Sequence, residues 1–158
     1  MKKFLKNNWY VILIIAIVLS CRLFGFFGIN YVSGYSMNNT LNDGQLTASS
    51  SIPKYLGKLK RGDIVTAYAD YTNVIKRIVG LPGETVEQKD GIIYIDGKKY
   101  DEPYLEDSLT KKSKQEDWSF TLKEDEYLIL GDNRDNSFDS RNFGPVKGTQ
   151  IKAIVFWY

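Results

Sequence analysis

Apolar residues form one long continuous run over residues 9–28, in which Arg22 is the only charged residue. A helix of about 20 residues spans about 30 Å, which matches the hydrocarbon core of a bilayer. Residues 1–8 carry lysines and no acidic side chain. The pattern predicts a single transmembrane helix over 9–28, with residues 1–8 in the cytoplasm and residues 29–158 outside the membrane.

Arg22 is the one residue in this run that conflicts with a membrane anchor. A charged side chain costs roughly 2.5–3.5 kcal/mol at the centre of a membrane helix, and less near an end, where its stem reaches the interface. A cleaved secretory signal is the alternative interpretation, since its apolar segment has a similar length. The bulky residues Leu23–Tyr31 contain no obvious small-x-small cleavage site, which favours an uncleaved anchor.

Residues 29–158 show short alternating or β-branched runs separated by turns, and no long helical period. Asp96-Gly97 between two such runs is typical of a two-residue hairpin. The charged stretch 111–117 is interpreted as a solvated loop. The pattern therefore predicts an all-β domain over 29–158. The expected strands are 64–68, 74–79, 92–95, 98–100, 126–130 and 151–158.

Composition excludes several kinds of chemistry. A chain of 158 residues with a net charge of +2 has the size of one domain and too little positive charge to indicate nucleic-acid binding. The chain contains no histidine, and its one cysteine, Cys21, lies inside the apolar run. Ser-His-Asp triads, Cys-His pairs and histidine zinc sites are therefore excluded. A serine nucleophile with a lysine base needs no histidine.

Lys76 is a candidate for such a base. Strand alternation places Val74, Lys76 and Ile78 on one face, so Lys76 has apolar neighbours on both sides. A free lysine is well under about 0.1% neutral at pH 7, but burial can lower its pKa by about 3–5 units. A lysine at a strand edge, with its amine in water, is the alternative interpretation.

The polar segment 131–144 is a second candidate for function, because long polar segments between strands often carry it. Asp139 and Arg141 fall on one face if the segment is extended, and there they can form an ion pair. A calcium loop is disfavoured, since Phe138 interrupts the oxygen donors and Arg134 occupies a ligand position. No metal site and no cofactor is expected.

Four blocks of residues follow one another along the chain: residues 36–41 (Ser-Met-Asn-Asn-Thr-Leu), 61–65, 76–84 and 131–144. Together they resemble type I signal peptidase, the membrane-anchored serine protease that removes secretory signal peptides. The resemblance is to bacterial members, particularly Gram-positive ones. Asn39 stands where the family usually has proline.

The resemblance implies specific roles for residues of these blocks. Ser36 would be the nucleophile, with its backbone N–H as an oxyanion donor, and Lys76 the general base. Ser137 would hydrogen-bond and orient the lysine. Asp139 and Arg141 would form a supporting ion pair, and Asp132 would be a second supporting carboxylate.

The resemblance also implies a fold of coiled antiparallel β-sheets and a preference for cleavage after small residues, of Ala-x-Ala type. The substrate, an exported precursor, would bind as an extended strand beside the bilayer. Met37, Leu41, Ile75 and Gly34 would line its binding pockets. Gly34 stands where some members have a serine that supplies the second oxyanion donor. The resemblance does not specify an oligomeric state.

Two other interpretations share parts of this pattern. A non-catalytic or dedicated assembly factor for a surface structure would keep the fold, but it would be expected to lack the reactive pair. A self-cleaving repressor with a Ser-Lys pair would carry a DNA-binding head where this chain has the apolar run. The presence of both Ser36 and Lys76 favours an active endopeptidase.

Overall fold

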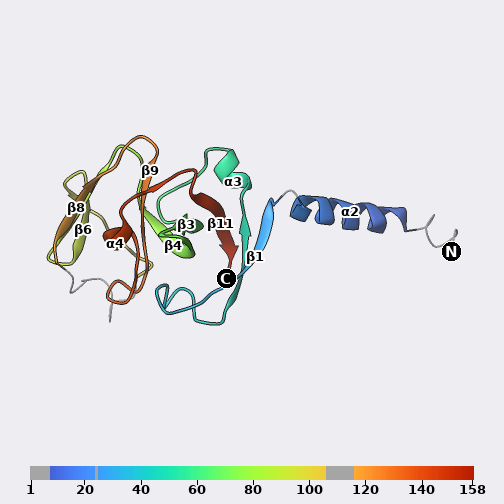
Figure 1. The fold of residues 1–158 in the computed structure, drawn as a ribbon, viewed down its shortest axis with the longest axis horizontal. Helices are drawn as coiled ribbons and strands as arrows, with labels where there is room; N and C mark the ends of the chain where they lie inside the picture. The colour runs from blue at the N-terminus through green and yellow to red at the C-terminus, as the bar shows by residue number, and fades with distance from the viewer. Residues whose placement is uncertain (1–7, 24, 106–115) are drawn as a thin grey trace.

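A computed structural model describes residues 8–23, 25–105 and 116–158. The N-terminal lysines, Phe24 and most of the charged stretch 111–117 lie outside these residues. Eleven strands form two sheets, with short helices at the loops and a longer helix at the N-terminal side (Figure 1). The elements are α2 (Trp9–Leu23), β1 (Phe27–Tyr31), β2 (Leu46–Ser50), α3 (Ile52–Tyr55), β3 (Ile64–Ala69), β4 (Thr72–Gly80), β5 (Thr85–Lys89), β6 (Ile92–Ile95), β7 (Lys98–Lys99), β8 (Trp118–Thr121), β9 (Glu126–Leu130), α4 (Ser140–Phe143), β10 (Val146–Lys147) and β11 (Ile151–Trp157).

The large sheet has seven strands in the order β1-β2-β11-β3-β4-β9-β10, and every pairing in it is antiparallel. Strand β4 is the longest and lies between β3 and β9. Register shifts interrupt β11 and the β4–β9 pair, which coils the sheet. The predicted all-β domain of coiled antiparallel sheets is confirmed for the described residues.

The small sheet has four strands in the order β7-β6-β5-β8 and continues directly from β4 through a short turn. Its β6–β7 hairpin turns at Asp96 and Gly97, which have φ values of 48° and 75°. Two successive positive φ values are what a type I′ turn requires, so the predicted hairpin is confirmed. In Figure 1 this sheet lies at the end of the molecule opposite α2.

The core is divided among three apolar clusters, and β4 contributes to all of them. Ile78 packs in one cluster with strands β3, β9 and β11, and Val79 packs in another with the small sheet. Ile75 packs against the third, which contains Met37 and Leu41. Because both faces of β4 are covered towards its end, a polar side chain there is removed from water.

Helix α2 covers a shorter segment than the predicted anchor. It spans 15 residues, and the chain then turns at Gly25, whose φ of 69° is incompatible with continuing the helix. Phe27 and Gly28 belong to β1 and pair with Ser50 and Ser49 of β2. The predicted helix over 9–28 therefore extends too far, since the helix of the structure ends at Leu23. None of the described helices has both the length and the apolar character that crossing a membrane requires.

Candidate active site

Ser36 lies in a loop, residues 32–45, that connects β1 to β2 and is closed at its base. Val32 donates its N–H to Gln45 O at 2.9 Å, and Gly44 returns a bond to Val32 O at 2.9 Å. The N–H of Gly34 donates to Asp43 Oδ1 at 2.7 Å, and the φ of 93° at Gly34 suits the absence of a Cβ. The two ends of the loop are therefore held together, while its middle extends to β4.

Lys76 lies on β4 opposite this loop and contacts the serine directly. Its Nζ donates to Ser36 Oγ at 2.7 Å and to Ile75 O at 3.1 Å. The residue is 4% exposed. No carboxylate of the described chain lies within ion-pair distance of this amine. The structure thus brings together two residues that are 40 positions apart in the sequence.

Burial lowers the pKa of the Lys76 amine to about 8. The charges of Asp139 and Asp132 act in the opposite direction, and the charge of Arg141 adds to the lowering. Each of these carboxylates is bonded to an arginine of its own: Asp139 to Arg141 at 2.7 Å and Asp132 to Arg77 at 2.6 Å. The lowering of the Lys76 pKa by desolvation exceeds the raising by Asp139 and Asp132, because each of these carboxylates is already paired with an arginine.

The predicted ion pair between Asp139 and Arg141 is formed, although the segment between them is not extended. Asp139 is the N-cap of α4 and forms a capping box with Asn142. Its carboxylate also accepts the Gly131 N–H at 2.9 Å. Burial opposes ionisation, but the bonds from Arg141 and Gly131 hold the pKa of Asp139 below its usual range. The carboxylate of Asp139 therefore stays charged near Ser36 and Lys76, the two residues called the dyad below.

Ser137 does not make the hydrogen bond to Lys76 that the resemblance implied. Its Oγ is buried and forms no hydrogen bond of ordinary geometry with any described residue. The hydroxyl lies near enough to Asp139 to add a smaller lowering of that carboxyl pKa. A Cβ at Gly131 would collide with both the Ser137 side chain and the Ser36 carbonyl oxygen. Glycine at 131 is what allows these two serines to approach so closely.

A cavity of about 160 Å³ opens beside the dyad, between the end of β1 and the first half of β4. Met37 and Ile75, two predicted substrate-binding residues, lie in its wall. Leu41 does not: it is fully buried behind Met37 in the core. Gly34 is also outside the wall, and its N–H donates to Asp43. The cavity is lined by Tyr31, Val32, Ser33, Ser36, Met37, Asn73, Val74, Ile75 and Lys76.

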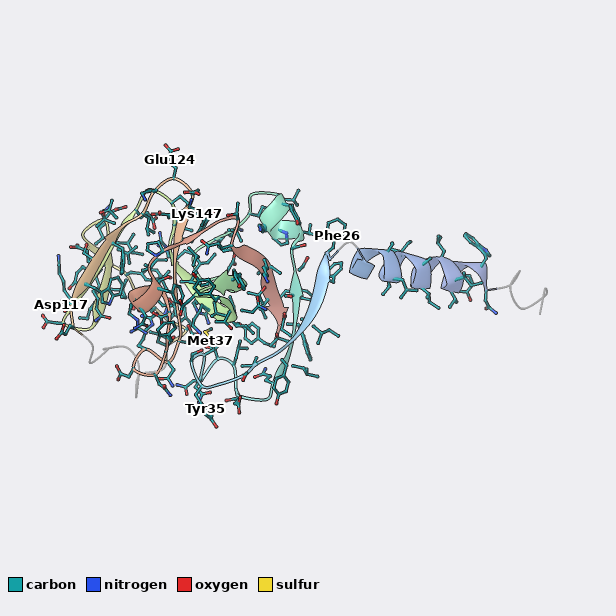
Figure 2. The ribbon with its side chains drawn as sticks, viewed as in Figure 1. Phe26, Tyr35, Met37, Asp117, Glu124 and Lys147 are labelled. Atoms are coloured by element: carbon teal, nitrogen blue, oxygen red, sulfur yellow. The ribbon has the colours of Figure 1, made fainter. Side chains whose placement is uncertain are left out.

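The two neighbours of Ser36 in the loop 32–45, which we call the nucleophile loop after the predicted role of Ser36, differ sharply in exposure. Tyr35 is 57% exposed and projects from the surface, whereas Met37 is 1% exposed and lies inside the domain (Figure 2). The loop therefore turns at Ser36, with one neighbour in solvent and the other in the core. This turn places the hydroxyl at the boundary between the cavity and the interior.

Three further residues hold the site together, and the sequence analysis assigned them no role there. Arg77 binds Asp132, which also accepts a hydrogen bond from Thr40 Oγ1 at 2.5 Å. Asn133 donates its backbone N–H to Ser36 O at 3.0 Å. Alternation had placed Arg77 on the face opposite Lys76, and an arginine beside apolar strand residues was the available signal. No cluster of three potential metal ligands occurs among the described residues.

Comparison with known proteins identifies the family. The sequence pattern of the family described as Signal peptidase, peptidase S26, matches residues 4–158. Signal peptidase I of Bacillus amyloliquefaciens is 40% identical over 149 residues, covering 89% of this chain and 80% of that protein. Signal peptidase IB of Staphylococcus aureus is 36% identical over 178 residues, covering 99% of this chain and 92% of that protein.

A solved structure agrees with these relatives. The crystal structure of a signal peptidase I from Enterococcus faecalis V583 superposes with a TM-score of 0.55 at 37% sequence identity. The match covers 63% of this chain and 97% of that chain. Together with the matched family pattern and the relatives from Bacillus and Staphylococcus, it shows that this chain belongs to the signal peptidase S26 family, as a type I signal peptidase of the Gram-positive kind.

Proposed function

We propose that this peptidase cleaves signal peptides with Ser36 as the nucleophile and Lys76 as the general base. One observation carries the proposal: a buried amine with no carboxylate partner among the described residues lies 2.7 Å from the serine oxygen. That distance is within direct proton-transfer range. With a pKa of about 8, about one tenth of the amine is neutral at pH 7, compared with well under 0.1% for a free lysine.

The reaction follows from this contact. Neutral Lys76 takes the Ser36 hydroxyl proton as the oxygen attacks the scissile carbonyl carbon, and the carbonyl becomes an oxyanion. The Ser36 N–H bonds to no acceptor among the described residues, so it is free to donate to that oxyanion. The Lys76 ammonium then protonates the leaving amine. Water attacks the resulting ester while Lys76 again accepts the proton. The bond to Ser36 Oγ then breaks, Lys76 returns the proton to that oxygen, and the cleaved signal peptide leaves as a carboxylate.

The surrounding ion pairs support the base in two ways. Asp139 and Asp132 are bonded to arginines, so neither is available to retain the proton of Lys76 as a direct partner. The bond from Gly131 to Asp139 closes the 131–139 segment on itself, and the bond from Thr40 to Asp132 joins that segment to the nucleophile loop. We assign supporting roles to Asp132, Asp139 and Arg141 on this basis. Ser137, packed against Gly131, is assigned to spacing rather than to bonding the amine.

The substrate would bind in extended form along β4. Residues 72–76 pair with β3 on one edge, whereas β9 pairs with β4 only from Arg77 onward. The uncovered edge of 72–76 is therefore available for main-chain pairing with a peptide beside Ser36. The adjoining cavity of about 160 Å³, walled by Met37 and Ile75, favours small side chains next to the cut. An Ala-x-Ala signal fits this description.

We propose a membrane location for this reaction, with the catalytic domain outside the cell and residues 1–8 in the cytoplasm. Exposed apolar side chains continue from α2 onto strands β1, β2 and β11, the first three strands of the large sheet. Such a surface is suited to contact with a bilayer, where exported precursors are delivered. Its members on the strands are Phe27, Ile29, Leu46, Phe156 and Trp157.

The test uses the full chain in detergent and a precursor with an Ala-x-Ala cleavage site. Ser36→Ala and Lys76→Ala should each abolish cleavage while the melting temperature stays near that of the unaltered protein. Ser119→Ala and Lys123→Ala, which change exposed residues of the same types, should cleave normally. Full activity of Ser36→Ala or Lys76→Ala would reject the dyad, and binding without cleavage by the unaltered chain would favour an assembly factor.

A further inference from the structure

Two arginine–carboxylate pairs are buried behind the contact between Ser36 and Lys76. Arg77 Nη2 lies 2.6 Å from Asp132 Oδ2, and Arg134 Nη2 lies 2.6 Å from Glu102 Oε1. All four residues are buried. Because burying charge is costly unless the partners stay in good geometry, each pair depends on whatever holds it in place.

Tyr104, which follows β7, contacts both pairs. Its ring lies over the Arg77 guanidinium, with 4.1 Å between the guanidinium carbon and the ring centre. Its hydroxyl donates to Glu102 Oε1 at 2.6 Å. Burial and the neighbouring Glu102 raise the pKa of the phenol, so the hydroxyl remains a donor. One side chain thus stacks on the first pair and bonds the second.

The first pair is connected to both members of the dyad. Arg77 follows Lys76 directly on β4, so its position is coupled to that of the base. Asp132 accepts a hydrogen bond at 2.5 Å from Thr40 Oγ1, and Thr40 lies in the same loop as Ser36. The Arg77–Asp132 pair therefore sets the spacing between the base strand and the nucleophile loop.

The second pair is connected to the nucleophile through the backbone. Arg134 Nε donates to Gly131 O at 3.0 Å, which fixes the turn over residues 131–134. Within that turn Asn133 donates its N–H to Ser36 O at 3.0 Å and its Nδ2 to Tyr35 O at 3.1 Å. The Arg134–Glu102 pair therefore holds the turn that holds the nucleophile.

We infer that Tyr104 is a positioning residue for cleavage, which keeps both arginine pairs in register and so holds Ser36 against Lys76. This inference rests on the proposed Ser-Lys dyad. It gives the segment after β7, between two strands of the small sheet, a role in a reaction carried out on the large sheet. A misplacement of about 1 Å can cost about 10²-fold in rate, so a small loss of register would be measurable.

The chain offers a matched control at Tyr100. Its ring lies 5.3 Å from the guanidinium of Arg61, which is paired with Glu84. This cluster repeats the chemistry of an aromatic ring, an arginine and a carboxylate. Among the described residues, the hydrogen bonds of Arg61 go to Val79 and Glu84, and not to Ser36 or Lys76. Tyr100→Leu and Tyr104→Leu therefore remove similar contacts with different connections to the dyad.

The experiment measures kcat and KM for the full chain in detergent, with an Ala-x-Ala precursor, beside the melting temperature of each variant. Tyr104→Leu should lower kcat by about 10- to 100-fold with KM changed less than about threefold. Tyr104→Phe, which keeps the ring over Arg77, should retain kcat to within about fivefold. Tyr100→Leu should lower the melting temperature comparably but keep kcat within about twofold.

Equal losses of kcat in Tyr104→Leu and Tyr100→Leu would overturn the inference, because both effects would then be merely structural. If Tyr104→Leu does not fold, Tyr104→Met, whose unbranched and flexible side chain adapts better to the space left by the ring, carries the same expectation. The unaltered protein and Ser36→Ala are measured first. Cleavage by Ser36→Ala would reject the dyad itself. If Ser36→Ala is inactive but Tyr104→Leu keeps the kcat of the unaltered protein, only the positioning role of Tyr104 is rejected.

Discussion

Lys76 and Arg134 are both buried cations, 4% and 2% exposed, but their surroundings differ in one respect. Arg134 is bonded by both carboxylate oxygens of Glu102, at 2.6 and 2.8 Å. Burial acts to lower the pKa of Arg134, but the charge and hydrogen bonds of Glu102 outweigh it and raise the pKa. Lys76 instead bonds to a neutral hydroxyl and a carbonyl, and burial lowers its pKa to about 8.

The comparison separates a cation held in an ion pair from the cation that we propose as the catalytic base. Burial is common to both sites, so burial alone does not produce a base. The deciding factor is whether the neighbouring carboxylates are already neutralised by another cation. At Lys76 they are, because Arg141 binds Asp139 and Arg77 binds Asp132. The arginines of this site therefore act on the lysine by occupying its potential partners.

The largest expected effect comes from replacing the proposed base, Lys76, by a cation that cannot lose its proton. Lys76→Arg would keep the positive charge, but an arginine stays protonated at any accessible pH. Cleavage should fall by more than about 10³-fold, as for loss of an essential base. Rates are measured with excess Ala-x-Ala precursor, and Lys123→Arg serves as the control. Substantial activity in Lys76→Arg would mean that another group accepts the serine proton.

Removing one partner of the Asp139–Arg141 pair should move the pH profile in opposite directions. Arg141→Met leaves Asp139 to act on Lys76, so the pKa of Lys76 rises and the acid limb of kcat/KM moves to higher pH. Asp139→Asn removes a charge that raises the Lys76 pKa, so the limb moves to lower pH. Each change should also cost about 3–5 kcal/mol of stability, since a buried charge loses its partner. Shifts of the same sign would contradict this account.

Stability should record the cost of keeping Lys76 buried. A pKa lowered from 10.5 to about 8 corresponds to about 3 kcal/mol at pH 7, because unfolding lets the amine regain its proton. Lys76→Met should therefore be more stable than the unaltered protein by up to about 3 kcal/mol at neutral pH.

The sign of this effect fixes its pH dependence. The unfolded chain binds the proton more tightly, so the stability of the unaltered protein rises between pH 8 and 10.5. The advantage of Lys76→Met should shrink over the same interval and vanish above it. Chemical denaturation at several pH values measures it, with the exposed Lys123→Met as the control. An advantage that did not depend on pH would indicate a packing effect instead.

The pH dependence of cleavage by the unaltered enzyme has the smallest expected effect but tests the base most directly. If neutral Lys76 is the base, kcat/KM should rise about tenfold per pH unit below its pKa and level off above it. The midpoint is expected at about pH 8. A midpoint near 4 would identify a carboxylate as the base and contradict the assignment to Lys76.

Six of the eleven described strands could be predicted from local patterns, because β-branched runs and turn residues act over a few positions. Strand β9 was predicted with its observed bounds, and β3, β4 and β11 to within two residues at each end. Strands β2 (Leu46–Ser50) and β5 (Thr85–Lys89) were not predicted, since their sequences are rich in serine, threonine and charged residues. Pairing with neighbouring strands overrides those weak preferences.

The turn between β3 and β4 was also not predicted from the sequence pattern. Asp70 and Tyr71, between β3 and β4, have φ values of 46° and 60°. A tyrosine rarely adopts such a conformation, so local preference did not predict a two-residue turn there. The turn extends both strands to Ala69 and Thr72 and thereby defines the register that sets Lys76 opposite Val65.

The sequence by itself determined which chemistry is available. The absence of histidine, the flanking apolar residues of Lys76 and the four blocks shared with type I signal peptidases all singled out Ser36 and Lys76. Those inferences needed only composition, strand alternation and motif order. They could not determine which carboxylate faces which cation, because that depends on the approach of segments far apart in the chain.

Only the tertiary structure decided how the site is solvated and held. It paired Arg77 with Asp132 across 55 positions and Arg134 with Glu102 across 32, which no local pattern indicates. It also placed Leu41 in the core and left Ser137 without a bond to Lys76. The physical reason is that a buried amine loses its proton only where distant segments both exclude water and supply arginines to the competing carboxylates.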